Sequence, residues 1–436
     1  MGECLPIRWA MVSTDCDVLV IGGGPGGSSA AAFARLRGLS VCLVERDEFP
    51  RFHIGESLLP MGNALLRASG AWPKVEAAGF VPKFGAEFML ADDSGGKEIV
   101  FAEGRVPGLE STFQVERARF DEILLEHARS LGAEVRTGTT VTGLAVSGDH
   151  VRATLSRRDA PSSELTARWV VDCGGRDNLY ESAEKRALDP PQFPKRAAVY
   201  SHFEGVRRAP GTRGGNIIIV RIEDGWFWII PISAERTSVG LVTSIDGIRQ
   251  AGDPQSVFDA TVAGSPRLRA LMERSKAVAP FRVTADYSYV RRDFASPRVI
   301  LAGDAAAFYD PIFSSGVYIA THSARMAVDA IARADAAGRP LSWLERRRYT
   351  RSLKAHGSVF RRLIEVFYDN DSFSVFMTQK PPLGLNSAIT TIVAGHANLT
   401  WPLWWRFRVF LGVCRIQRYL PLVPRIGHTS RVFRAA

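Results

Sequence analysis

Six consecutive residues near the start of the chain, Gly22-Gly-Gly-Pro-Gly-Gly27, have the spacing of a turn that binds a dinucleotide pyrophosphate. The turn follows a short apolar run, residues 17–21, which predicts a buried parallel strand. Gly22 permits the tight turn, Gly24 lets the backbone approach a pyrophosphate, and Gly27 lets the following helix pack closely on the strand. The free N–H groups at the start of that helix would then face the phosphates.

A second apolar strand is predicted over residues 41–44, and it ends at Glu45. Glu45 stands about as far beyond the last glycine as the acidic residue that accepts a hydrogen bond from a ribose hydroxyl. The pattern therefore predicts a dinucleotide site. A Gly-rich turn in some other strand–helix–strand unit is the alternative, and the motif alone does not distinguish FAD from NAD.

A second candidate for ligand binding is the loop Phe308-Tyr-Asp-Pro-Ile-Phe-Ser-Ser-Gly316, which precedes a predicted helix over residues 317–337. Backbone N–H groups at a helix start lack intrahelical partners and lie at the positive end of the helix dipole. Ser315 and Gly316 could therefore bind an anion. An ordinary helix start without a ligand is the alternative.

The elements that position these residues are interleaved along the chain. Nucleotide-binding patterns recur in four separate segments, with Gly- and Pro-broken strand patterns inserted between them. This order suits FAD, a long ligand held by several strands, better than NAD. We predict an α/β protein with an α+β second lobe, divided into a Rossmann-like FAD-binding domain (15–196 and 280–340), an antiparallel-sheet substrate lobe (197–279) and a basic, helical C-terminal extension (341–436).

The positive charge of the chain is concentrated at its C-terminal end. The 436 residues carry a net charge of +10, and residues 343–436 alone contain 15 Lys or Arg against 4 Asp or Glu. This segment could be a lid on the substrate lobe, a docking surface for an acidic partner, or a contact with a membrane surface. Its aromatic residues are too interrupted by Arg and Pro for a membrane span. The lid is favoured over the other two interpretations, contact with a membrane surface is not favoured, and nucleic-acid binding is ranked last.

The five cysteines are scattered and have no metal-ligand spacing, so they are interpreted as small buried thiols and no metal site is predicted. No secretory signal precedes the first predicted strand. We therefore expect a protein of the reducing cytoplasm.

Several motifs together resemble the FAD-dependent monooxygenase superfamily and, within it, the flavin-dependent halogenases. The Gly-rich unit, the stretch from Gln114 to Asp121, Asp172-Cys-Gly-Gly-Arg176 and Gly303-Asp304 resemble the FAD sites of the superfamily. Two further motifs match halogenase signatures: Trp226-Phe-Trp-Ile-Ile-Pro231 matches W-x-W-x-I-P, and the Phe308–Gly316 loop matches F-x-x-P-x-x-S-x-G. The alternative for the motif at residues 226–231 is an ordinary aromatic-rich strand of a buried sheet.

The resemblance implies a role for each matching residue. Trp226 and Trp228 would separate flavin from substrate, which blocks direct hydroxylation. The amides of Ser315 and Gly316 would hold the halide. Lys83 stands in Lys-Phe-Gly-Ala-Glu-Phe88 and would be the catalytic lysine that positions or carries hypohalous acid, a solvated lysine being the alternative. The implied cofactor contacts are Gly22, Gly24, Gly27, Glu45, Arg46, Ser57, Arg117 at the pyrophosphate, Gly303, and Asp304 at a ribitol or phosphate-side group.

One position departs from the halogenases of free tryptophan, which carry Glu immediately before the serine of the second signature. Here that position is Phe313, so the chain resembles the branch that acts on phenols or pyrroles, often tethered to a carrier protein. We also expect His53, Glu56 and Ser57 to line the flavin side. A structural role is favoured for Glu56 over a catalytic one.

The predicted function is halogenation of an electron-rich aromatic ring with reduced FAD, O2 and chloride or bromide, chlorination being favoured. Because Asp172-Cys-Gly-Gly-Arg176 matches only in part the motif that engages a nicotinamide, reduced FAD is expected from a separate flavin reductase. A FAD-dependent aromatic hydroxylase or another FAD oxidoreductase is the alternative enzyme. A non-catalytic flavin-binding docking subunit is the alternative of another class, and intact Lys83 and tryptophan motifs argue against it.

Overall fold

The structure is a computed structural model that describes residues 14–177, 196–251, 253–286 and 288–427. Its first sheet is seven-stranded, in the order β7-β2-β1-β10-β9-β8, with β18 also paired to β10. The strands β7, β2, β1, β10 and β18 are parallel, and β8 and β9 are antiparallel. Their bounds are β1 Cys16–Ile21, β2 Val41–Val44, β7 Glu134–Arg136, β8 Thr139–Val146, β9 Val151–Arg157, β10 Ser163–Asp172 and β18 Val299–Leu301.

The central parallel strands are apolar along nearly their whole length because both faces of the sheet are covered. Helix α1 (Pro25–Leu36) is almost fully buried and packs against α4 (Arg117–Ser130) and α9 (Gly316–Ala336). The glycine turn begins directly after Ile21 and so lies at the carboxyl end of β1, where parallel sheets bind ligands.

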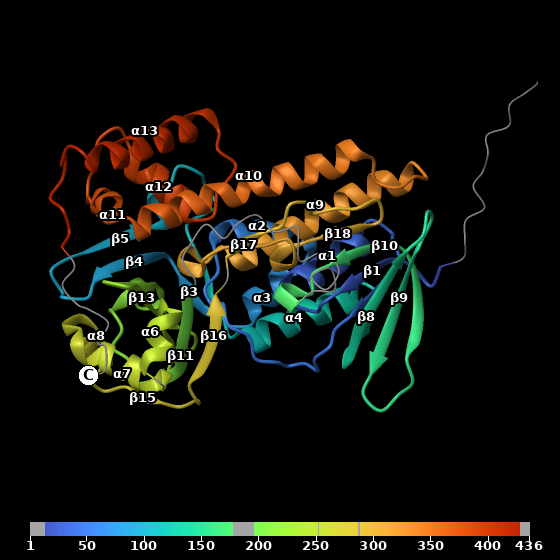
Figure 1. Cartoon of the computed structure of the whole chain (residues 1–436), viewed down its shortest axis with the longest axis horizontal. Helices are drawn as coiled ribbons and strands as arrows, with labels where there is room; N and C mark the ends of the chain where they lie inside the picture. Colours follow the sequence, from blue (N-terminus) through green and yellow to red (C-terminus); the bar gives the residue numbers. More distant parts are fainter. Residues whose placement is uncertain (1–13, 178–195, 252, 287, 428–436) are drawn as a thin grey trace, which may run out of the picture.

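The second sheet is eight-stranded, in the order β15-β11-β14-β13-β12-β4-β5, with β16 paired to β11 (Figure 1). Most of its strands come from the region where the substrate lobe is expected. Residues 85–100 add β4, which pairs in parallel with β12, and the edge strand β5, which pairs with β4. The bounds are β4 Gly85–Leu90, β5 Gly96–Val100, β11 Arg196–Glu204, β12 Ile217–Ile222, β13 Gly225–Pro231, β14 Thr237–Ser244, β15 Lys276–Ala277 and β16 Arg282–Asp286.

Alternation along β13 sends its side chains to two different cores. Trp226, Trp228 and Ile230 face the large core that is shared with the first sheet. Phe227 and Ile229 face a smaller core under the helices α6 (Ile245–Ala251), α7 (Pro254–Gly264) and α8 (Pro266–Met272). The signature motif is therefore a strand with one face toward the first domain and one toward the covering helices.

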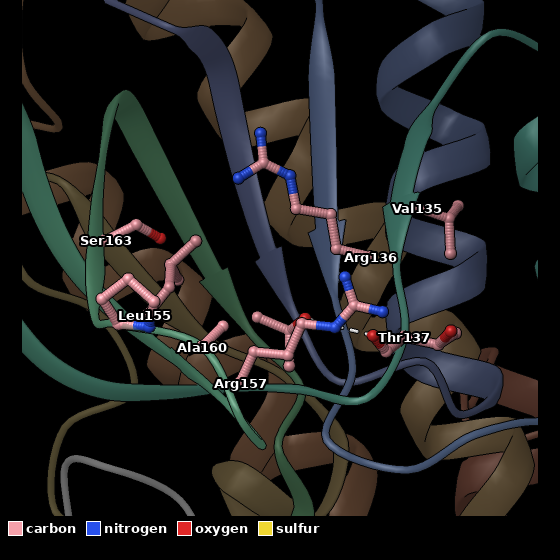
Figure 2. A pocket seen from close by; sticks show the side chains of 9 residues that line it. Val135, Arg136, Thr137, Leu155, Arg157, Ala160 and Ser163 are labelled. Carbon is pink, nitrogen blue, oxygen red and sulfur yellow. Dashed lines mark hydrogen bonds between the residues drawn. The ribbon is translucent and has the colours of Figure 1, made fainter.

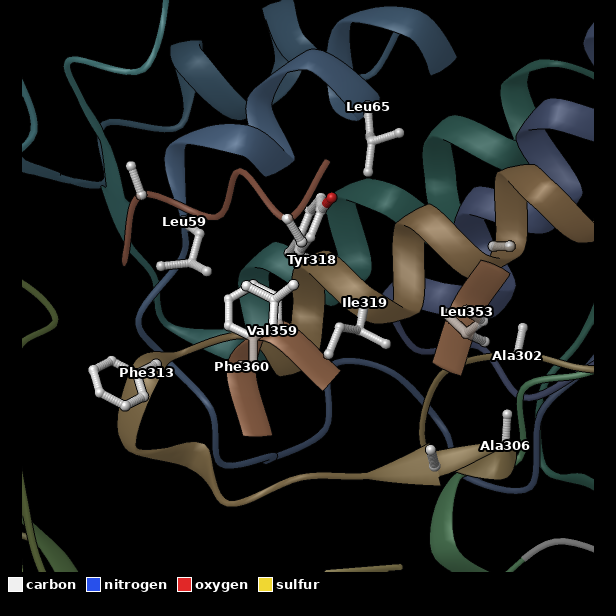
Figure 3. Close-up of a cluster of buried hydrophobic side chains, with 14 of the residues drawn as sticks. Leu59, Leu65, Ala302, Ala306, Phe313, Tyr318, Ile319, Leu353, Val359 and Phe360 are labelled. Carbon is white, nitrogen blue, oxygen red and sulfur yellow. The ribbon is translucent and has the colours of Figure 1, made fainter. Parts of the chain in front are cut away.

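The C-terminal part is helical and contacts both sheets. Helix α10 (Trp343–Tyr368) begins with a capping box between Ser342 and Glu345 and packs along α9 (Figure 3). The helices α11 (Asn370–Phe376), α12 (Leu385–Val393) and α13 (Trp401–Gln417) follow at the β4–β5 edge (Figure 1). Among the described helices, none is both long enough and apolar enough to span a lipid bilayer. The predicted α/β fold class, with its Rossmann-like domain and helical C-terminal part, is confirmed.

Candidate active site

A cavity of about 480 Å³ opens where the carboxyl ends of the first sheet meet β13 and the loop before α9. Most of the residues predicted from the sequence line it. These are Gly22, Gly24, Glu45, Arg46, Ser57, Arg117, Trp226, Trp228, Gly303, Asp304 and Gly316. His53 and Glu56, expected on the flavin side, also line it. The three predicted residues that do not line the cavity are Gly27, Lys83 and Ser315.

The glycine turn leaves no room for side chains where the backbone must come close. Gly22 has a positive φ of 94°, and a Cβ at this residue would lie 2.6 Å from the carbonyl oxygen of Cys173. A Cβ at Gly27 would lie 1.7 Å from the carbonyl oxygen of Gly22, so Gly27 serves the packing of α1 on β1. Gly24 is the N-cap of α1 and borders the cavity, which gives the cavity a helix N-terminus that can face a pyrophosphate.

Glu45 orders the turn as well as bordering the cavity. Its Oε2 accepts a hydrogen bond from the Gly23 N–H at 2.5 Å, and its Oε1 accepts one from the Asp47 N–H at 2.9 Å. Each carboxylate oxygen can accept a further bond, so both backbone contacts are compatible with a ribose hydroxyl as an additional donor.

Two arginines at the turn differ in how their charge is used. Arg117 is held by a bidentate ion pair with the buried Asp121 (2.7 and 2.8 Å) and by the carbonyl oxygen of Ile54. Arg51 lies beside Gly24, and its buried Nε has no hydrogen-bond partner among the described residues. Its guanidinium group forms long ion pairs with Asp47 (3.8 Å) and Asp121 (3.5 Å), and an arginine beside Gly24 with one nitrogen free of hydrogen bonds fits an anion such as the FAD pyrophosphate. Sequence reasoning missed Arg51, and an arginine in a loop gives no signal of its own.

The far end of the cavity carries the Gly303-Asp304 pair. The Gly303 N–H donates to Ser323 Oγ of α9 at 2.8 Å, which fixes the turn after β18. Burial raises the pKa of Asp304 to about 6, while Arg176 and Arg117 oppose this rise. A carboxyl group that borders the cavity under two guanidinium groups can bind the hydroxyl groups of a ribitol chain. With the open glycine turn and Arg51, these residues fit FAD.

The two signature tryptophans form one wall of the cavity. Their rings lie 5.9 Å apart and are tilted by 53°. Trp228 Nε1 donates to Ser238 Oγ at 3.1 Å, and the ring lies against Gly240, where a Cβ would approach it to 2.2 Å. Trp226 Nε1 donates to Tyr368 Oη at 2.9 Å, at the end of α10. Both rings are therefore fixed by bonds from their indole nitrogens.

Tyr368 also connects Trp226 to the loop expected to hold the halide. Its hydroxyl donates to Asp310 Oδ2 at 2.6 Å, and Asp310 Oδ1 accepts from the Ile312 N–H at 3.0 Å. Burial raises the pKa of Asp310, and the bond from Tyr368 opposes that rise. The chain Trp226–Tyr368–Asp310 thus joins β13, α10 and the loop. The sequence did not reveal it, because Tyr368 lies outside both signatures.

The Phe308–Gly316 loop ends at the start of a helix, which is the position that the predicted anion site requires. Ser314 has a positive φ of 55°, Ser315 is the N-cap of α9, and the helix begins at Gly316. A Cβ added to Gly316 would meet nothing within 4 Å, so there is space beside this amide at the edge of the cavity. Phe313, labelled in Figure 3, is buried. Its ring lies 6.0 Å from that of Phe88 and 6.5 Å from that of Phe367. An apolar ring therefore occupies the position where tryptophan halogenases carry Glu.

Lys83 ends β3 (Val81–Lys83) and lies behind the cavity wall, with only 1% of its surface exposed. Its Nζ donates to Ser57 Oγ and to the Leu58 carbonyl oxygen, both at 2.8 Å, and Ser57 lines the cavity. Burial lowers the pKa of Lys83 to about 7. The amine is therefore buried and loses its proton more readily than a solvated lysine, with Ser57 between it and the cavity.

A carboxylate–imidazole pair that the sequence did not predict also borders the cavity. Glu56 Oε1 lies 2.8 Å from His202 Nε2, and its buried Oε2 has no hydrogen-bond partner among the described residues. His202 comes from β11, so the pair joins the two sheets. The residues lie far apart in sequence, and no local pattern indicates their contact.

A second cavity, also of about 480 Å³, lies beside β7, β8 and β9 (Figure 2). Arg136 and Arg157 border it, and it shares Thr139 with the first cavity. It contains no residue of the halogenase signatures, so the chemistry is assigned to the first cavity.

Comparisons with known proteins agree with this geometry. A family model described as an FAD binding domain matches residues 15–339. The chain is 36% identical over 343 residues to a 1H-pyrrole-2-carbonyl-(peptidyl-carrier protein) chlorinase of Pseudomonas fluorescens, covering 73% of this chain and 76% of the relative. It is 32% identical over 324 residues to the corresponding brominase of Pseudoalteromonas luteoviolacea, covering 73% and 77%.

A solved structure is similar along almost the whole chain. The flavin-dependent brominase Bmp2 superposes with a TM-score of 0.80 at 27% identity, covering 93% of this chain and 98% of that one. Fold, cavity and signatures therefore lead to one assignment, and the resemblance predicted from the sequence is confirmed: the chain belongs to the flavin-dependent halogenase family.

Proposed function

We propose that this protein halogenates an electron-rich aromatic ring, a phenol or a pyrrole, and that Lys83 transfers the halogen. The observation that carries the proposal is the amine of Lys83, buried behind Ser57 with its pKa lowered to about 7. A buried, uncharged amine is a nucleophile, whereas a solvated lysine at neutral pH is not.

Reduced FAD, when bound, supplies the electrons that reduce O2 and so allows halide to be oxidised to hypohalous acid. The residues of this chain hold and direct the reactants. The N–H groups of Ser315 and Gly316 hold the halide at the start of α9, and Trp226 and Trp228 close the cavity between cofactor and substrate.

Hypohalous acid then reacts with the neutral amine of Lys83. A nitrogen–halogen bond forms, an N–H proton is lost, and the hypohalite oxygen leaves as water. The halogen passes to the aromatic carbon, whose proton is lost as the amine is restored. Burial lowers the pKa of Lys83, and this keeps the amine reactive.

The substrate and the remaining partners are proposed from three findings. Phe313, buried against Phe88, stands in the loop where the halogenases of free tryptophan carry Glu, which favours a phenol or pyrrole over tryptophan. Relatives include halogenases named for a pyrrole on a peptidyl carrier protein, which supports a carrier-borne substrate. Since these relatives include a chlorinase and a brominase, both halides are candidates. A separate flavin reductase is proposed as the source of reduced FAD, because Asp172-Cys-Gly-Gly-Arg176 matches the nicotinamide motif only in part.

The test is reconstitution with a flavin reductase, NADH, O2 and either chloride or bromide. Substrates are free phenols, the N-acetylcysteamine thioester of pyrrole-2-carboxylic acid, and the same acyl group on a peptidyl carrier protein. Mass spectrometry should show product with the halogen isotope pattern, formed only when reductase is present. A product with one added oxygen and no halogen would assign the protein to the hydroxylases instead.

A further inference from the structure

The exposed apolar surface of this protein is concentrated in one part of the chain. Of the fifteen large apolar side chains that are exposed among the described residues, eight lie between residues 383 and 422. Trp401, Trp404 and Tyr419 are 72%, 42% and 89% exposed. Exposed aromatic residues at this density mark an interaction surface.

Helical spacing places several of these side chains on one face. Helix α13 buries Leu403, Phe407, Phe410 and Cys414 against the helices beneath it. The opposite side carries Trp401, Trp404, Arg408 and Arg415, and Tyr419 continues it in the turn that follows. We call these five residues the outer face of α13. Trp401 and Trp404 stack at 5.2 Å, and the guanidinium group of Arg408 lies 5.7 Å from the Trp404 ring.

This face is basic, and its basic residues are arginines. Residues 372–436 contain seven Arg and one Lys, and no Asp or Glu. Arg418 and Arg425 form ion pairs with Asp369 and Asp371, whereas none of the ion pairs of the described chain involves Arg408 or Arg415. Protein interfaces are enriched in Trp, Tyr and Arg and depleted in Lys, Asp and Glu. The composition therefore favours an acidic protein as the partner over a lipid surface.

The outer face is one helix layer away from the residues that hold Lys83. Helix α13 packs on α12, and α12 packs on residues 101–105 through the Arg105 N–H, which donates to Thr391 Oγ1 at 2.7 Å. Just after α12, the Ala394 carbonyl oxygen accepts from the Met61 N–H at 3.1 Å. The segment that contains Met61 also contains Leu58, whose carbonyl oxygen binds Lys83. A partner on α13 thus sits close to the proposed reaction centre.

We propose that the outer face of α13 docks an acidic carrier protein that bears the aromatic substrate as a thioester. This inference rests on the proposed function, because it names the partner that brings the substrate to Lys83. The apolar rings would form the centre of the interface, and Arg408 and Arg415 would pair with carboxylates of the carrier protein.

The test measures carrier binding separately from catalysis. A peptidyl carrier protein loaded with the pyrrole-2-carbonyl group is labelled, and its affinity is read by fluorescence anisotropy at 50 mM and 500 mM NaCl. Arg408→Glu combined with Arg415→Glu should weaken binding at least tenfold at low salt, and wild-type binding should weaken at high salt. The matched control is Arg347→Glu, because Arg347 lies 4.9 Å from the exposed Trp343 ring on α10 and forms the same kind of pair elsewhere. The Arg347→Glu variant should bind the carrier protein as tightly as wild type does.

Activity separates this inference from the proposed function. The double variant should lose at least tenfold in kcat/KM for the carrier-bound substrate and keep the kcat/KM of wild type for the N-acetylcysteamine thioester. If wild type halogenates neither substrate yet binds the carrier protein through α13, the proposed function fails and the docking surface stands. Equal carrier affinity of wild type and double variant would overturn the docking surface. So would binding of phosphatidylglycerol vesicles, or self-association, in place of carrier binding.

Discussion

Two buried lysines of this protein have similar surroundings and different consequences. Lys83 and Lys97 are 1% and 4% exposed, and burial lowers their pKa values to about 7 and about 8. Each lies over a phenylalanine ring, at 5.4 and 5.3 Å. Lys97 Nζ donates to the carbonyl oxygens of Phe376 and Thr378 and so ties β5 to the C-terminal helices.

The difference lies in what each amine can reach. Both bonds of Lys97 end on backbone oxygens inside the protein, whereas one bond of Lys83 ends on Ser57 at the cavity wall. A buried lysine with a lowered pKa is therefore not by itself a sign of catalysis. The contact with the cavity distinguishes Lys83, and Lys97 serves as its internal control.

The largest effect is expected from removing the amine of Lys83. Lys83→Ala should reduce halogenated product at least ~10²-fold, because the group that positions the halogen is lost. Binding of FAD and its reoxidation should stay close to wild type. Lys97→Ala should keep product formation per folded enzyme and lower the melting temperature, since it loses two buried hydrogen bonds. A Lys83→Ala enzyme that halogenates within a few-fold of wild type would make the two lysines equivalent and refute the comparison.

The next effect concerns the halide at the start of α9. Gly316→Pro removes one N–H at the first helical position. The halide concentration needed for half-maximal rate should rise about tenfold, as expected for the loss of a hydrogen bond to an ion. Gly316→Ala keeps the N–H, and an added Cβ meets nothing within 4 Å, so its halide dependence should match wild type. Identical halide curves for the proline and alanine variants would exclude this amide from the site.

A similar effect is expected from pH, through the titration of Lys83. The lowered pKa of Lys83, about 7, means that the amine loses its proton and becomes reactive as pH rises through this value, so product per turnover should rise about tenfold from pH 6 to pH 8. Burial lowers the pKa of Lys97 to about 8, but Lys97 does not line the cavity. Lys97→Ala should therefore leave the midpoint of the pH profile of product formation unchanged. Lys83→Arg should be nearly inactive at both pH values, because arginine stays protonated. A midpoint that survives in residual Lys83→Arg activity would belong to another group.

The smallest effect should come from the chain Trp226–Tyr368–Asp310. Tyr368→Phe removes the acceptor of the Trp226 indole and a donor to the buried Asp310. We expect a few-fold fall in product per NADH oxidised, because the tryptophan wall and the halide loop lose a shared tether. The control is Tyr349→Phe on the same helix, whose hydroxyl donates to the Leu301 and Ser323 carbonyl oxygens. Both variants should lose stability. If both form the same amount of product per NADH oxidised, the role of Tyr368 is structural only.

Local sequence patterns were sufficient where the site depends on neighbouring residues. The glycine turn, the ends of β1 and β2 and the start of α9 follow from spacing and apolar periodicity, and the tryptophans on β13 from their match to a family signature. Contacts between distant segments could not be predicted. The pairing of β4 with β12, the bond from Trp226 to Tyr368 and the pair of Glu56 with His202 depend on tertiary packing. The burial of Lys83 belongs to this second group, because only the folded chain excludes water from it.

The most direct test of the central claim follows the hypohalous acid itself. Wild type and Lys83→Ala are supplied with equal amounts of reduced FAD, O2 and halide, and a soluble β-diketone traps hypohalous acid that leaves the enzyme. The account predicts that Lys83→Ala halogenates the trap in place of the aromatic substrate, with total oxidised halide unchanged. Loss of trap and substrate halogenation together would place Lys83 before halide oxidation and contradict its role in halogen transfer.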